Sequence, residues 1–445
     1  MATFRNKSYF LWISILIVFG VALMQVLNSS IGLIVFLSAF GGLAVFSAMK
    51  DMAVPVLLFF LPWSPLLKLQ PGMISVYSIA LITVMIVYVF RNSKSFSFGH
   101  VIPAALLFVQ TIIIKTLKDD PIDNGYVLFF ACLILFPIIA SEKDKEYDFY
   151  TLVMFFSVGI IGAALSAQQL MVFPTISRYI TVHEYSSLTR LSGFYGDPNF
   201  YSAHIAAAIS CVLVLLLNEV KLSRKIILYI SLIVLFYAGF LSVSKSFTLI
   251  IICVALLWIV EVLFRRGKIS GKLMMLLALA IGGVFVLSSV LFTDLIDMIL
   301  DRFLGGNDTL SDFTTGRTEL WISYLRAFED NPWMMVFGEG FTEKLINGRG
   351  SHNVLIQSIY QFGIVGTVFL TVWVLSYFKS LLRSARLYSN NIVQTLVLAT
   401  GTFGPWLGID PIMFDEFFLL PFLASIGILY ISRISESENS LEARI

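Results

Sequence analysis

The sequence predicts an all-α membrane protein, a polytopic bundle of about 14 (12–14) transmembrane helices with a long extracytoplasmic helical insert. Two observations predict this fold class. Of the 445 residues, 58% are hydrophobic and only 13% are charged, whereas about a quarter of a soluble domain is charged. Apolar runs of roughly 20 residues, the length of a membrane-spanning helix, recur from end to end. A β-barrel would instead show alternating segments of about ten residues.

Fourteen apolar segments are candidate spans. They fall at about 9–27, 31–49, 52–67, 74–90, 101–117, 125–140, 149–170, 200–217, 225–243, 246–264, 272–292, 353–378, 391–409 and 414–433. The third is short and contains Pro55, Pro62 and Pro65, which favour a kinked or re-entrant segment. The first is too long for the apolar part of a signal peptide, so we interpret it as a retained helix.

The distribution of charge predicts the orientation of the bundle. Most of the 30 Lys and Arg residues fall in short loops on one side if the N-terminus is cytoplasmic. Both termini are therefore expected in the cytoplasm. Three polar elements are expected outside it: the loop 171–199, the turn around Ser244-Lys245-Ser246 and the insert 293–352. A net charge of only +2 leaves no footprint for nucleic acid.

The insert 293–352 is expected to hold two short amphipathic helices, at 294–304 and 316–329, on the membrane surface or capping the bundle. Acidic residues outnumber basic ones in it, so any anion site there must be focal. The chain then divides into three parts. These are N-terminal transmembrane helices (1–170), a core with the two outer loops and the candidate site (171–378), and C-terminal transmembrane helices with a cytoplasmic tail (379–445).

The stretch from Arg190 to Asn199 places charge and tight turns directly before an apolar run. Asp197-Pro198 predicts a helix start, because aspartate caps free N–H groups and proline suits the first helical position. Gly193 would allow a tight turn or the close approach of a ligand. Arg190 is either a solvated loop charge or an anion ligand, and its companions must decide between the two.

Two further cations are candidates for an anion site. Arg317 follows Gly316 at an expected helix start, where free N–H groups and a guanidinium fork would together bind phosphate. The alternative is a surface arginine paired with Glu319. Lys245 lies between two spans, where an ammonium is a functional candidate unless it only reaches to the membrane interface.

His352 is the strongest candidate for a catalytic residue. Ser351 is expected to cap a spanning helix, with His352 in its first turn on the outer side. Histidine titrates near pH 6.5 and can take a proton from a hydroxyl at neutral pH. The alternative is a histidine that merely sits at the interface. The sequence has no metal-spaced His/Cys cluster and no phosphate loop, so no metal, cofactor, ATP or nucleotide-sugar is expected.

Short motifs follow one another in a fixed order. They are Arg190-x-x-Gly193-x-x-x-Asp197-Pro198-Asn199, Ser244-Lys245, Gly316-Arg317-x-x-x-Trp321, Gly338-x-Gly340, His352-Asn353-x-Leu355 and Gln361-Phe362-Gly363-x-x-Gly366. This order resembles the O-antigen ligase and Wzy-type polysaccharide polymerase superfamily. The resemblance covers about 190–366, and the preceding helices agree with it only in hydropathy.

The resemblance implies a GT-C-type glycosyltransferase of the bacterial plasma membrane. Such enzymes move a glycan from a polyprenyl-diphosphate-linked donor to a hydroxyl of a lipid-linked acceptor glycan, with inversion and without metal. By position, His352 would activate the acceptor hydroxyl, and Arg190 and Arg317 would hold the diphosphate. The expected substrate-binding set is Lys245, Gly193, Asp197, Asn199, Gly316, Gly338, Gly340 and Asn353. Lys245 stands where many relatives have arginine, so it offers a point charge and no fork.

Other functions stay open. A transporter or flippase for the same lipid would also need phosphate-binding cations, although transporters show repeated halves and charges near the midplane. A sensor or scaffold is a third class. Within the superfamily, a polymerase and a ligase differ by acceptor, and the residue usage leans only weakly toward capsular or exopolysaccharide polymerisation. The lipid bilayer is an expected partner, and a flippase and a chain-length regulator are candidate protein partners.

Overall fold

The computed structural model of the chain describes residues 2–91, 98–122, 124–141, 148–180, 183–185, 188–219, 221–265, 316–341, 345–385 and 391–442. The expected span at 272–292 and the expected amphipathic helix at 294–304 lie outside these residues.

The described residues form an all-helical membrane bundle with one small hairpin. Nine of their helices are long and apolar enough to cross a membrane. Four shorter apolar helices accompany them, at Ala53–Trp63, Val76–Arg91, Asn124–Ile139 and Ile392–Leu407. Each of these helices falls on an expected span, which confirms the helical membrane class. The count of about 14 spans and the long insert are not confirmed.

The described residues in the first half of the chain form eight α-helices, two of them short. In order they are α1 (Ala2–Val26), α2 (Ser30–Met49), α3 (Ala53–Phe60) with the 3₁₀ turn η1 (Leu61–Trp63), α4 (Val76–Arg91), α5 (Phe98–Leu117), α6 (Asn124–Ser141), α7 (Phe149–Leu170) and α8 (Pro174–Ser177). Strands β1 (His183–Tyr185) and β2 (Leu188–Arg190) then pair antiparallel, with His183 opposite Arg190. The expected loop 171–199 is therefore partly structured.

The rest of the chain contains the helices whose starts lie nearest to most of the candidate residues. They are α9 (Pro198–Asn218), α10 (Leu222–Phe240), α11 (Lys245–Arg265), α15 (Arg317–Asp330), α16 (Pro332–Phe337), η3 (Ile346–Gly348), α17 (Val354–Leu381), η4 (Leu382–Ser384), α18 (Ile392–Phe403), η6 (Gly404–Leu407) and α19 (Glu416–Glu442). The helix expected at 316–329 is confirmed as α15.

Helix α9 lies at the centre of the bundle and is the most enclosed of the candidate spans. It packs against α7, α10, α11, α18 and α19. Its small residues allow this close packing, since Ala203, Ala206, Ala207 and Ala208 are all buried. Helices α3 and α7 are also closely packed, because a Cβ at Gly159 would lie 2.2 Å from the carbonyl oxygen of Phe59. The Pro-containing segment Ala53–Trp63 is therefore a short helix inside the bundle, fully surrounded by protein.

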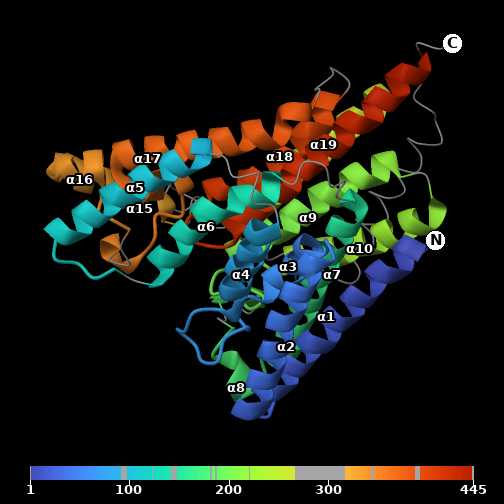
Figure 1. The fold of residues 1–445 in the computed structure, drawn as a ribbon, viewed down its shortest axis with the longest axis horizontal. Coiled ribbons are helices and arrows are strands. Elements are labelled where there is room, and N and C mark those ends of the chain that lie inside the picture. Colours follow the sequence, from blue (N-terminus) through green and yellow to red (C-terminus); the bar gives the residue numbers. More distant parts are fainter. Residues whose placement is uncertain are drawn as a thin grey trace.

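The chain ends lie on one side of the molecule (Figure 1), where the start of α1 and the end of α19 are both at the right of the view. Because α19 begins at Glu416 and crosses the bundle, the turn 408–415 before it lies at the far end from the C-terminus. The starts of α9, α11 and α17 gather near that turn, as the contacts below show. One end of the bundle thus collects the candidate residues.

Helix α17 is broken at Gly363, whose φ of 66° and ψ of −179° are not helical. The segment 338–341 enters this break: the N–H groups of Glu339 and Gly340 donate to the carbonyl oxygens of Tyr360 and Gln361 at 2.8 and 2.9 Å. From α5, the side-chain amide of Gln110 donates to the carbonyl oxygens of Phe337 and Phe362. The break therefore satisfies its backbone groups with a neighbouring segment, as a lipid-embedded helix must.

Candidate active site

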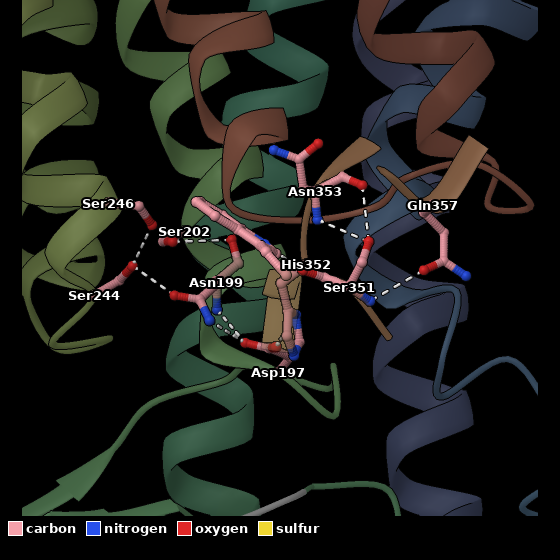
Figure 2. Close-up of polar contacts among 10 residues, drawn as sticks. Asp197, Asn199, Ser202, Ser244, Ser246, Ser351, His352, Asn353 and Gln357 are labelled. Atoms are coloured by element: carbon pink, nitrogen blue, oxygen red, sulfur yellow. Dashed lines mark hydrogen bonds and ion pairs between the residues drawn. The ribbon is translucent and has the colours of Figure 1, made fainter. Parts of the chain in front are cut away.

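The start of α9 carries the first part of the site. Asp197 caps the helix, accepting a hydrogen bond from the Asn199 N–H at 2.7 Å, and Pro198 occupies the first helical position. The expected capping role of Asp197 is therefore confirmed. The same carboxylate oxygen, Oδ1, also accepts from the Asn199 side-chain amide at 2.7 Å. Asp197 is thus fixed in place by one neighbour through two bonds (Figure 2).

Arg190 is anchored to the turn that follows α10. Its Nε donates to the carbonyl oxygen of Ser242 at 3.0 Å, and the next residue, Leu191, bonds Leu241 through the backbone. Gly193 has a φ of 58°, and a Cβ there would lie 2.8 Å from the Tyr201 ring. Both conditions favour glycine. Arg190 and Gly193 therefore fix the entry of the loop into α9.

The turn after α10 joins the same site through hydroxyl groups. Ser244 Oγ donates to Asn199 Oδ1 at 2.8 Å and lies 2.9 Å from Ser246 Oγ. Lys245, between the two serines, is the first residue of α11. The sequence predicts Lys245 in the turn between two spans, and it lies at the end of that turn as the first helical residue. Its role in phosphate binding stays a prediction.

His352 lies just before α17 and not in its first turn, which corrects the expectation. Asn353 is the cap: its Oδ1 accepts from the N–H groups of Leu355 and Ile356 at 3.0 and 3.2 Å. Ser351 instead bonds Asn353, with Oγ donating to its carbonyl oxygen at 2.9 Å. Asparagine competes well with serine as a cap because its oxygen reaches two donors here. His352 takes a left-handed backbone, with φ 50°.

Helix α15 supports the segment before His352. Trp321 Nε1 donates to the carbonyl oxygen of Ser351 at 2.9 Å, and the Tyr324 hydroxyl donates to that of Arg349 at 2.8 Å. Gly316, with φ 77°, precedes the helix, so Arg317 is its first residue as predicted. The motif Gly316-Arg317-x-x-x-Trp321 therefore places a cation at the helix start and a clamp on the histidine segment one turn later.

These elements bring three charged or titratable groups together. His352 Nδ1 lies 3.7 Å from Asp197 Oδ2, with side chains 31% and 26% exposed. The Arg317 guanidinium reaches the turn 408–415, since a Cβ at Gly408 would lie 2.7 Å from its Nη1. The same position would lie 3.5 Å from Ser246 Cβ. Arg317, Asp197 and His352 therefore share one site at one end of the bundle.

The surroundings keep His352 neutral at physiological pH. Burial lowers the pKa of its imidazole below the usual value, Asp197 opposes that shift, and the guanidinium groups of Arg317 and Arg349 reinforce it. Burial also lowers the pKa of Arg317, which Asp197 opposes. Arginine titrates far above neutral pH, so Arg317 stays charged. A neutral base beside a fixed cation can take a proton from a hydroxyl next to an anion.

Asp410 is a site residue that the sequence analysis missed. It lies in the turn before α19, and a Cβ at Gly350 would lie 2.8 Å from its Oδ2. Burial raises the pKa of Asp410 to about 7, helped by the negative charge of Asp197. A signal was present, because Asp410-Pro411 repeats the dipeptide Asp197-Pro198 near the mouth of another span. At neutral pH this carboxyl can donate or accept a hydrogen bond.

Gly338 and Gly340 belong to the segment 338–341, which packs into the break of α17. A Cβ at Gly340 would lie 2.9 Å from Ile114 on α5, and Gly338 meets the backbone of Gln361 and Gly363. The motifs Gly338-x-Gly340 and Gln361-Phe362-Gly363 are thus partners that pack on each other. Their conformation accounts for these glycines structurally, and a contact with substrate stays a prediction.

Comparison with known proteins adds one finding. Residues 230–371 match the family model described as O-antigen ligase. The match confirms the resemblance to the O-antigen ligase and Wzy-type superfamily. It includes Arg317 and His352 and stops before Asp410. Neither a curated protein nor a solved structure matches the chain.

Proposed function

We propose that this chain is a bacterial surface polysaccharide polymerase of the plasma membrane. It transfers glycan from a polyprenyl-diphosphate-linked donor to a hydroxyl of a lipid-linked acceptor glycan, with inversion. The observation that carries the proposal is the meeting of a neutral base, His352, with a fixed cation, Arg317, around Asp197. The O-antigen ligase family match over 230–371 supports the same chemistry.

In the proposed reaction, His352 takes the proton of the acceptor hydroxyl while the hydroxyl oxygen attacks the anomeric carbon of the donor sugar. The bond from that carbon to the diphosphate oxygen breaks on the opposite face, so the configuration inverts. The electron pair leaves with the polyprenyl diphosphate. Arg317 and Arg190 neutralise the charge that builds on this leaving group, and fixed cations do so without reorganising.

Other groups complete the proposed donor site. Free N–H groups at the start of α15, beside Gly316 and Arg317, favour an anion. Lys245 adds a point charge from the start of α11. Asn199, Asn353 and the hydroxyls of Ser244 and Ser246 offer hydrogen bonds to sugar. We place this end of the bundle outside the cytoplasm and both termini inside, because the basic loops favour that orientation.

The test uses purified protein in lipid nanodiscs, supplied with lipid-linked repeat units. We expect a ladder of polymer lengths on a gel. His352→Ala should reduce polymer formation by at least about 100-fold, in the range of a lost general base. Its thermal unfolding should stay near that of the wild type, because His352 lies outside α17. Normal polymer from this variant would remove the proposed base.

Two other functions have an observation in their favour. The matching family is described as O-antigen ligase, and a ligase would add one block to a different acceptor without a ladder. The break of α17 at Gly363 is of a kind that transporters use. A transporter would move the lipid-linked glycan across a vesicle and form no product. The nanodisc assay, repeated in vesicles, distinguishes the three outcomes.

A further inference from the structure

A chain of hydrogen bonds runs from the start of α11 to Asp197 (Figure 2), and its donors all point one way. The Asn199 amide donates to Asp197 Oδ1, which leaves Asn199 Oδ1 to accept from Ser244. Because the Ser244 hydroxyl donates its one hydrogen to Asn199, the donor between the two serines is the Ser246 hydroxyl. Each link therefore delivers a donor toward the Asp197 carboxylate, and the last donor holds Oδ1 in place.

This arrangement occupies one carboxylate oxygen and leaves the other for the histidine. Asp197 Oδ1 accepts from the Asn199 N–H and side-chain amide, both at 2.7 Å. Asp197 Oδ2 faces His352 Nδ1 at 3.7 Å. That nitrogen is buried and has no hydrogen-bond partner within the described part of the chain. The distance between these two atoms is thus about 1 Å longer than in a hydrogen bond. Catalytic hydrogen bonds often shorten only when substrate is bound.

We propose that Asp197 is the positioning residue of His352, holding its imidazole through Nδ1–H so that Nε2 carries the free lone pair. The inference rests on the proposed function, in which Nε2 takes the proton of the acceptor hydroxyl. A carboxylate that fixes the tautomer and stabilises the imidazolium is a recurring partner of catalytic histidines on unrelated folds. Asp197 then acts through His352 and does not itself touch the reacting atoms.

The charges around Asp197 agree with this role. The proposed donor carries a diphosphate, and a carboxylate repels an anion, so Asp197 is poorly suited to bind it directly. Arg317, in contrast, is a cation whose charge Asp197 stabilises. One carboxylate thus serves two neighbouring groups, the base and the leaving-group cation.

The backbone of His352 is fixed by the hydrogen bonds of the two residues that flank it, Ser351 and Asn353. Ser351 receives a hydrogen bond from Trp321 Nε1 on its carbonyl oxygen, and its N–H donates to Gln357 Oε1 at 3.0 Å. Asn353 is fixed as the helix cap. Between them, His352 keeps a φ of 50°, which is uncommon for a residue other than glycine. Strained backbone that its surroundings maintain is typical of functional positions.

The main test is Asp197→Asn, because asparagine keeps an oxygen that can cap α9 and removes only the charge. We expect kcat to fall at least about 100-fold, as for a catalytic histidine that loses its carboxylate. KM for the lipid-linked donor should change less than about twofold. A raised KM with unchanged kcat would mean that Asp197 binds substrate, and would overturn the proposal.

The pH profile separates positioning from capping. Among the described residues, the charged groups that face His352 are Asp197, Arg317 and Arg349, and of these Asp197 is the one that raises the pKa of the imidazole. Asp197→Asn should therefore move the acid limb of the kcat profile to lower pH, while the plateau falls. Loss of a helix cap alone would leave the position of that limb unchanged, and such a result would contradict the proposal.

A readout independent of transfer uses protein labelled with ¹⁵N-histidine. The signal of His352 is assigned by its absence in His352→Gln. In the wild type we expect the neutral tautomer with the proton on Nδ1, and in Asp197→Asn a mixture of tautomers with a lower imidazole pKa. An unchanged spectrum would overturn the inference. If neither the wild type nor any variant makes product but the spectrum changes as expected, the proposed function fails and the His352–Asp197 pairing stands.

Two further variants guard against misfolding. Asn199→Ala keeps the Asn199 N–H that Asp197 caps but removes the amide donor, and we expect kcat to fall by about tenfold, as for one lost hydrogen bond. Ser202→Ala is the matched control, because within the described residues Ser202 Oγ donates to the Asn199 carbonyl oxygen in the same turn of α9, at 3.0 Å, and does not join the chain that leads to Asp197. It should retain activity within about twofold. Equal losses in both variants would indicate damage to α9 and contradict the proposal.

Discussion

Gly338 and Gly363 meet backbone to backbone inside the break of α17: a Cβ at Gly338 would lie 2.5 Å from the amide nitrogen of Gly363. Both residues have positive φ, 83° and 66°. Gly363 also combines this φ with a ψ of −179°, a region that side chains other than glycine avoid. The motifs Gly338-x-Gly340 and Gln361-Phe362-Gly363 therefore depend on each other. Their contact holds the part of α17 between His352 and the break at Gly363.

Gly363→Ala should destabilise the protein by about 1–3 kcal/mol from backbone strain alone. The added methyl would also overlap the backbone of Val336 and Phe337. Thermal unfolding in detergent measures the loss. Gly42→Ala in α2 is the control, because nothing lies within 4 Å of its added Cβ. Equal melting temperatures for the two variants would show that the break tolerates a side chain.

The two arginines should respond differently to replacement by lysine. Arg190 uses Nε to hold the Ser242 carbonyl oxygen, so Arg190→Lys should lower both thermal stability and turnover. Arg317 begins a half-exposed helix, so Arg317→Lys should lower turnover by about 10- to 100-fold with little change in stability, because a bidentate fork becomes a point charge. Polymer yield and melting temperature are measured together. Arg326→Lys, exposed on the same helix α15, is the control, and turnover indifferent to Arg317→Lys would argue against diphosphate binding.

Asp410→Asn should stabilise the protein more at pH 8 than at pH 5. The pKa of Asp410 is about 7 in the fold against an ordinary value of 3.8. A carboxyl with a raised folded pKa opposes folding as it ionises. That penalty is absent below pH 3.8, grows between 3.8 and about 7, and is complete above 7. Asparagine cannot ionise, so its gain in melting temperature should follow the same window. A gain that is the same at both pH values would contradict the burial of this carboxyl.

Much of the site could be predicted from local signals. Asp197-Pro198 predicts a helix start from two adjacent residues, and Gly316-Arg317 predicts another, and both are found. The sequence favours Ser351 as the cap of α17, but the cap is Asn353. Both residue types are good caps, and the choice depends on Trp321 and Gln357, which hold Ser351 from elsewhere. The repeated Asp-Pro dipeptide marks Asp410 in the sequence, but its raised pKa arises mainly from burial, which only the folded chain produces.

By itself, the sequence determined that the chain is a helical membrane protein, where most of its apolar helices begin and end, and which residue types stand at their mouths. These properties depend on hydropathy and capping, which act over one helix at a time. Only the tertiary structure decided that Asp197 faces His352, that Arg317 reaches Gly408, and that Gly338 packs into the break at Gly363. Such contacts depend on which helices pack together, and the alternation of apolar runs carries no information about which neighbour each one meets.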